Sequence, residues 1–207
     1  MNADGKKMHV PRLTLADLRA ARAAFEEREP RDVFYRAAIE LVGLALKKRI
    51  RLTVADALAV LLQTWNKNFY RFGRTFDGNH FAEIEGLLHR HKKQLTAFRL
   101  RNIESLEAAD EDDVLEVFQE FESVLGPVGA AKALHLLAPR FFPIWDREVA
   151  RRLRVSLGRT GTNERRYWTL MLIAKSQCLD LRQQGGEHNL LKAIDEYNYC
   201  KFTLGIL

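Results

Sequence analysis

The sequence predicts an all-α protein, and three observations support this fold class. Apolar residues recur at helical spacing along most of the 207 residues, and strand-like alternation of useful length appears nowhere. The pairs Thr14/Asp17 and Thr53/Asp56 each have the spacing of a capping box, which starts a helix. Prolines such as Pro30 interrupt the helical pattern at only a few points.

The expected helices follow the chain in order. The first ends before Pro30, because the residue before a proline resists the helical conformation. The second closes on three basic residues, which complement a helix C-terminus, and Asn79 is the expected cap of the fourth. The predicted set is 14–29, 32–49, 53 to about 69, 79–94, 110–125, a short helix ending at Pro139, a helix from Asp146, 163–182 and 187–199.

Periodicity also predicts which residues form the core. On the helix from Thr53, the side chains of Leu58, Leu62 and Trp65 share one face. The helix at 110–125 begins with four acidic residues, as the helix dipole favours, and carries a buried stripe. Its members are Val114, Phe118, Phe121 and Leu125.

Composition bounds the class of protein. We expect residues 1–12 to be a flexible, basic tail and residues 13–207 to be a single domain. A formal charge of +6 favours a polyanionic partner. Cys178 and Cys200 are too few for a disulfide framework or an iron–sulfur cluster, and we expect no metal and no cofactor. No charged-then-apolar leader and no run of eighteen apolar residues is present, so we expect a cytoplasmic protein without a membrane partner.

The stretch 125–153, LGPVGAAKALHLLAPRFFPIWDREVARRL, organises the chain. A glycine- and proline-bearing turn opens a short helix that carries Lys132, and a proline-punctuated loop then delivers Asp146 to an arginine-rich helix. This order resembles the helix-hairpin-helix superfamily of DNA glycosylases, the base-excision enzymes related to endonuclease III and 8-oxoguanine glycosylase. The resemblance covers about thirty residues, within a hairpin and Pro/Asp loop at 111–155, and is remote from the housekeeping members.

The resemblance implies a two-lobed helical fold, a cleft between the lobes and an aspartate that carries the chemistry. Asp146 occupies that place and is also a plausible helix N-cap. The family hairpin usually contains Leu-Pro-Gly-Val-Gly, whereas this chain exchanges the first glycine and proline. In members with a catalytic lysine, that lysine falls two residues after the last glycine. Lys132 follows Gly129 by three, so either Lys132 is the nucleophile or Ala131 occupies its place and the covalent step is absent.

Other residues gain expected roles from the same resemblance. Asn66 is the expected wedge that fills the gap left by a flipped base. An aromatic surface for that base is expected from Phe142, Trp145 and Tyr70. Backbone contacts to DNA are expected from the hairpin and from the arginine-rich segment, where seven arginines lie between positions 147 and 166. The expected DNA-contacting residues are Gly126, Val128, Gly129, Ala130, Arg147, Arg151 and Arg152.

We therefore predict a monomeric DNA glycosylase that acts on double-stranded DNA containing a modified base. Oxidised, alkylated or hypermodified phage bases are all open as targets, and so are repair and phage defence as roles. The first alternative is a helix-hairpin-helix module that binds DNA without catalysis. The second is a protein-interaction domain whose basic surface serves only solubility.

Overall fold

A computed structural model describes residues 10–72, 75–186 and 189–207. All regular structure in these ranges is helical, which confirms the all-α prediction. Most of the predicted tail lies outside the described residues. The longer helices are α1 (Leu15–Arg28), α2 (Val33–Leu46), α3 (Val54–Trp65), α5 (Gly78–Arg90), α6 (Lys92–Arg99), α7 (Glu111–Leu137), α9 (Glu164–Gln183) and α10 (Leu190–Asn198). Shorter elements are η1 (Pro30–Asp32), α4 (Lys67–Phe72), η2 (Ile103–Ser105), η3 (Ala108–Asp110), α8 (Arg147–Arg152) and the π-helix Tyr199–Leu204.

Both capping boxes are present where the sequence predicts them. The Thr14 hydroxyl accepts the amide proton of Asp17 at 3.1 Å, and the Asp17 carboxylate accepts the amide proton of Thr14 at 2.8 Å. Thr53 and Asp56 repeat this exchange at the start of α3. The predicted cap at Asn79 is wrong, because Asp77, two residues earlier in the chain, caps α5 and leaves Asn79 inside the helix.

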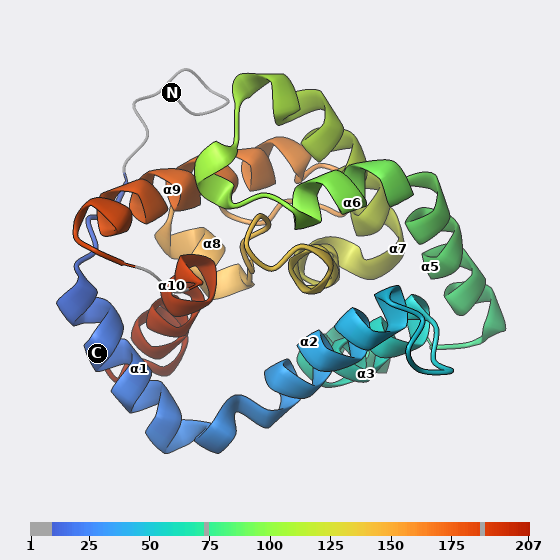
Figure 1. The fold of residues 1–207 in the computed structure, drawn as a ribbon, viewed down its shortest axis with the longest axis horizontal. Coiled ribbons are helices and arrows are strands. Elements are labelled where there is room, and N and C mark those ends of the chain that lie inside the picture. Colours follow the sequence, from blue (N-terminus) through green and yellow to red (C-terminus); the bar gives the residue numbers. More distant parts are fainter. Residues whose placement is uncertain (1–9, 73–74, 187–188) are drawn as a thin grey trace.

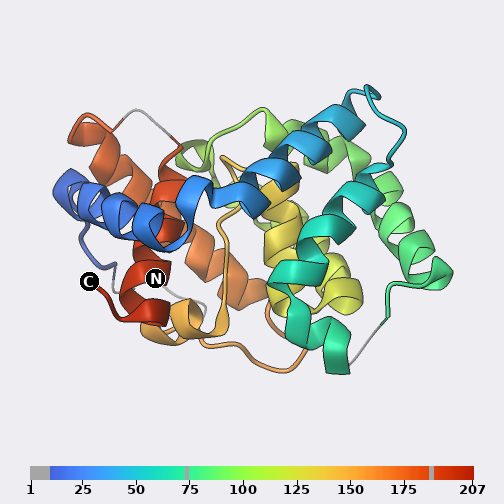
Figure 2. The same ribbon diagram turned by 90° about the horizontal axis from the view of Figure 1, so that it is seen from below.

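The helices gather in two sets around one continuous core. Helix α1 packs against α10, although most of the chain separates them, and α9 and the π-helix join this set. Helices α2, α3 and α5 form the other set, and α7 contacts both. Figures 1 and 2 show the same division, and in Figure 1 the chain passes from α1 to α2 along the lower edge of the view.

The predicted turn lies inside α7. Gly126 has φ +70° and ψ 167°, so the helix breaks there into two segments that run in different directions (Figure 1). Pro127 starts the second segment, where a missing N–H costs no helical hydrogen bond. An added Cβ at Gly126 would lie 3.0 Å from the Phe69 ring of α4, so close packing and positive φ both require glycine.

The predicted core stripe of α7 is confirmed, since Val114, Phe118, Phe121 and Leu125 are all fully buried. Trp65 differs from its prediction, because it is only partly buried and faces a cavity. No helix in the described part of the chain is both long and apolar enough to span a membrane.

Candidate functional site

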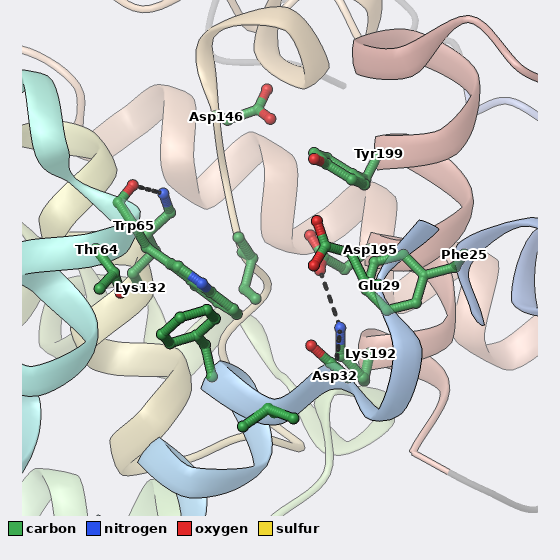
Figure 3. A pocket seen from close by; sticks show the side chains of 13 residues that line it. Phe25, Glu29, Asp32, Thr64, Trp65, Lys132, Asp146, Lys192, Asp195 and Tyr199 are labelled. Carbon is green, nitrogen blue, oxygen red and sulfur yellow. Dashed lines mark hydrogen bonds and ion pairs between the residues drawn. The ribbon is translucent and has the colours of Figure 1, made fainter. Parts of the chain in front are cut away.

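A cavity of about 380 Å³ lies between the two sets of helices. This volume is in the range of small-molecule sites, about 300–1,000 Å³. Trp65 and Lys132 line one wall, and Lys192, Asp195 and Tyr199 line the wall opposite, with Asp146 at one end (Figure 3). The lining also includes Glu29 and Asp32, so its carboxylates outnumber its two ammonium groups.

Asp146 ends the proline-punctuated loop and caps α8. One carboxylate oxygen accepts the amide proton of Val149 at 2.7 Å, which confirms the N-cap prediction. The other accepts the hydroxyl proton of Thr203 from the π-helix at 3.3 Å. The carboxylate is only partly buried and also lines the cavity, so capping leaves it accessible to a ligand.

Lys132 lines the same cavity from α7. Its ammonium donates to the backbone carbonyl of Trp65, which is the last residue of α3 (Figure 3). Burial lowers the pKa of Lys132, while the nearby carboxylates of Asp195 and Asp146 oppose that shift. Lys132 is the sixth residue counted from Pro127 and so lies beyond the first turn of the second segment of α7.

A compact charge cluster forms the opposite wall. The Lys192 ammonium lies 3.0 Å from Asp32, 3.5 Å from Glu196 and 3.8 Å from Asp195. It also lies over the rings of Phe25 and Tyr35, 4.7 and 4.5 Å from their centroids. Burial alone would lower the pKa of Lys192, but the three carboxylates outweigh it and raise the pKa.

Asp195 makes the longest of the three carboxylate contacts to Lys192, at 3.8 Å, and its carboxylate faces the cavity. Burial raises the pKa of Asp195 to about 6, with Lys192 and Lys132 opposing the shift and Asp146 and Glu196 adding to it.

The aromatic wall is held by a buried histidine. Tyr35 stacks on Trp65 with ring centroids 5.9 Å apart and an angle of 8° between the ring planes. The hydroxyl of Tyr35 lies 3.0 Å from Nε2 of His135, and Nδ1 of His135 lies 2.8 Å from the carbonyl of Phe142. A carbonyl can only accept, so Nδ1 carries the proton and Nε2 accepts from Tyr35. Burial lowers the pKa of His135 to about 4 and keeps this arrangement neutral.

The wedge prediction for Asn66 is wrong. Asn66 is buried, and its amide donates to the carbonyl of Leu125 at 3.1 Å, just before the break in α7. Gly129 lies against the same amide, so that an added Cβ would stand 2.6 Å from Asn66 Nδ2. Asn66 thus joins α3 to the turn and is not available to enter DNA.

The turn itself is largely covered. Gly126, Gly129 and Ala130 are buried and Val128 is half-buried. Packing on Phe69 and Asn66 accounts for the two glycines. Phosphate contacts by these four residues stay a prediction.

The base-pocket prediction is wrong for Phe142 and Trp145. Both are fully buried and lie away from the cavity, in an aromatic cluster with Phe118 and Tyr167. This cluster supports the loop that ends at Asp146, and the Tyr167 hydroxyl donates to the carbonyl of Pro143 at 2.8 Å.

Tyr70 also lies elsewhere. It stacks on Phe76, 4.2 Å between centroids, and its hydroxyl lies 3.2 Å from His80 Nε2. Tyr70 does not line the cavity, and a base-binding role for this partly buried residue stays a prediction.

The three predicted arginines are exposed at α8. Glu148 lies 2.6 Å from Arg151 and 2.9 Å from Arg152, and these hydrogen bonds lower the pKa of Glu148 to about 2. Arg147 is exposed beside Asp146. Glu148 occupies the Nε and Nη2 donors of Arg151 and the Nε donor of Arg152, and competes with a phosphate for these groups.

Sequence reasoning missed the wall opposite Trp65. Lys192, Asp195 and Glu196 have the spacing of an ordinary solvated helix face, i to i+3 and i+4. The sequence did contain a signal: aromatic and apolar residues surround Asp195 and Glu196 in α10, and such neighbours argue against a solvated face.

Among the described residues, no three histidine, cysteine, aspartate or glutamate side chains are grouped so as to hold a metal ion. No protein-family model, curated protein or solved structure matches the chain.

Proposed function

We propose that the chain is a DNA glycosylase that binds a modified base in this cavity and cleaves its N-glycosidic bond. The observation that carries the proposal is Asp146, a helix-capping carboxylate that lies open to a cavity of small-molecule size with an aromatic wall. The break at Gly126 and the loop that follows support it, because their order along the chain resembles the helix-hairpin-helix glycosylases. The proposal includes the two-lobed arrangement of that superfamily, with the two helix sets as lobes.

Asp146 is the group that stabilises the reacting sugar. As the bond to the base breaks, positive charge develops on the deoxyribose, and a fixed anion lowers the energy of that state. The Val149 amide and the Thr203 hydroxyl hold the carboxylate in place without neutralising it. Trp65 offers a face on which a base can stack.

The contact made by Lys132 supports a monofunctional enzyme. Its ammonium donates to the free carbonyl at the end of α3, a contact that favours the charged form, which is the stronger donor, and directs the nitrogen at the protein backbone. A covalent step would need the neutral amine, directed at the sugar instead. Borohydride should therefore trap no protein–DNA adduct that depends on Lys132, whereas loss of trapping in Lys132→Ala would show a bifunctional enzyme.

The decisive experiment compares Asp146→Asn with Asp77→Asn. Both aspartates cap a helix through a bond to a backbone amide, at 2.7 Å for Val149 and 2.9 Å for His80, and asparagine caps about as well. Both variants should fold and bind duplex. Base release, measured as abasic sites across a panel of modified duplexes and phage DNAs, should fall at least about 100-fold in Asp146→Asn alone.

Other outcomes are equally informative. Full base release by folded Asp146→Asn would show that this carboxylate has no catalytic role. A wild-type protein that binds duplex with strong salt dependence but releases no base from any DNA would favour the non-catalytic module. An isotherm that is unchanged between low and physiological salt would contradict both DNA-binding functions.

A further inference from the structure

The carboxyl group of Asp195 shares the cavity with that of Asp146. Asp195 caps nothing with its side chain, and its oxygens face the cavity near the Lys192 ammonium. The electrostatic influence of Asp146 on Asp195 places the two groups in one local field. Two carboxyl groups whose surroundings hold them in different protonation states are the usual arrangement for acid–base work on a glycosidic bond.

Asp146 and Asp195 differ in their hydrogen-bond partners and in the charges around them. Both oxygens of Asp146 accept hydrogen bonds, one from the Val149 amide and the other from the Thr203 hydroxyl. Burial raises the pKa of Asp195, and the nearby anionic groups Asp146 and Glu196 add to this rise, while Lys192 at 3.8 Å opposes it. The charged or titratable groups around Asp195 are Lys192 and Glu196 on α10, Asp32 on η1, Arg22 on α1, Glu29 between α1 and η1, Tyr35 on α2, Lys132 on α7, Asp146 at α8, and Tyr199 and Cys200 on the π-helix.

We infer that Asp195 is the general acid of the reaction proposed above, and that it donates its proton to the leaving base. This inference rests on the proposed function and names a second catalytic residue at the same site. On this inference, Asp195 is needed only for bases that would leave as anions if they were not protonated.

The proton and electron balance is simple. When the bond between C1′ and the base nitrogen breaks, its electron pair goes to the base, and the Asp195 proton follows to give a neutral base. The Asp195 carboxylate that remains lies beside the Lys192 ammonium. Water adds to C1′ and gives a proton to the Asp146 carboxylate, after which both aspartates exchange protons with solvent.

Two leaving groups separate this role from a structural one. Uracil, hypoxanthine and 8-oxoguanine leave as anions without an acid, whereas N7-methylguanine is already cationic and leaves as a neutral base. Asp195→Asn should therefore slow release of the first group on the order of 100-fold and leave N7-methylguanine release within a few-fold of wild type. Glu196→Gln is the matched control, because it removes another carboxylate 3.5 Å from Lys192 without altering the cavity lining.

The pH profile gives a second measurement that needs only the wild-type protein. The protonated form of Asp195 is the active one. The rate of release of a base that is neutral in DNA, such as uracil, should therefore rise as the pH falls through about 6. The rate of N7-methylguanine release should not show this rise at low pH. Asp195→Asn should abolish the rise for bases that are neutral in DNA.

Each outcome decides the matter. Base release by Asp195→Asn at the wild-type rate, a wild type that releases only cationic bases, or equal slowing of both leaving groups would each overturn the role of Asp195 and leave Asp146 standing. No base release by the wild type would overturn both assignments together. The supporting result is that Asp195→Asn selectively slows release of the bases that leave as anions and flattens the pH profile of their release.

Discussion

Lys192→Met would show how strongly the charge cluster holds the cavity wall. Methionine keeps most of the volume of the side chain but leaves Asp32, Asp195 and Glu196 without their common cation. Unit charges 3.0 Å apart, the Lys192–Asp32 separation, attract by about 5 kcal/mol at an effective dielectric constant near 20. Desolvation of the ammonium, which is 11% exposed, offsets part of this attraction.

The expected net loss in the free energy of unfolding is about 3–5 kcal/mol at pH 7, as for other buried pairs that lose one partner. Urea unfolding of wild type and variant, followed by circular dichroism, measures it. The loss should shrink at lower pH, because protonated carboxyl groups no longer repel. Asp32→Asn in the Lys192→Met background should restore part of the stability. A loss below about 1 kcal/mol, with no dependence on pH, would refute the view that Lys192 is held by buried charges.

Three further predictions concern other parts of the fold. His135 is neutral in the folded protein, where its pKa is lowered from 6.5 to about 4. Its contribution to the free energy of unfolding is therefore complete above pH 6.5 and is lost as the pH falls toward 4. The shift corresponds to about 3 kcal/mol, and His135→Gln should remove this part of the pH dependence in urea unfolding. Gly129→Ala should cost about 1–3 kcal/mol, because its Cβ meets Asn66 at 2.6 Å, whereas Gly43→Ala, with open space at its Cβ, should stabilise α2 slightly in thermal melts. Glu148→Gln should release Arg151 and Arg152 and give tighter duplex binding with a steeper salt dependence; unchanged binding would show that these arginines do not contact DNA.

Local signals predicted the helices well. Capping boxes, acidic first turns and apolar stripes act within one or two turns, so the boundaries of α1, the start of α3 and the buried face of α7 follow from the sequence. The end of α3 does not, because the helix predicted to reach about residue 69 ends at Trp65. Asn79 and Asp77 are both of a residue type that caps helices, and the structure uses Asp77.

The site was predicted less completely, because its walls come from distant parts of the chain. Asp146 and Lys132 were found in one motif and do line one cavity. Phe142 and Trp145 were assigned to a ligand because aromatic residues in a loop near a functional aspartate are typical of a binding surface. In the structure, their rings are needed to support that loop from within. Asp195 lies in another helix, and nothing in its local sequence indicates Asp146 as a neighbour.

The pairing of the first helix with the last determines when the cavity can exist. Pro11, Leu13 and Leu15 are bound through backbone groups to glutamines at 177 and 184, and α1 then packs along α10. During synthesis α1 leaves the ribosome early and must wait for partners that are made more than 150 residues later. The walls of the cavity carry residues from both ends, Phe25 among the first and Tyr199 among the last. The helices between them can pair as they emerge, so a nascent chain carries a folded middle before it has a site.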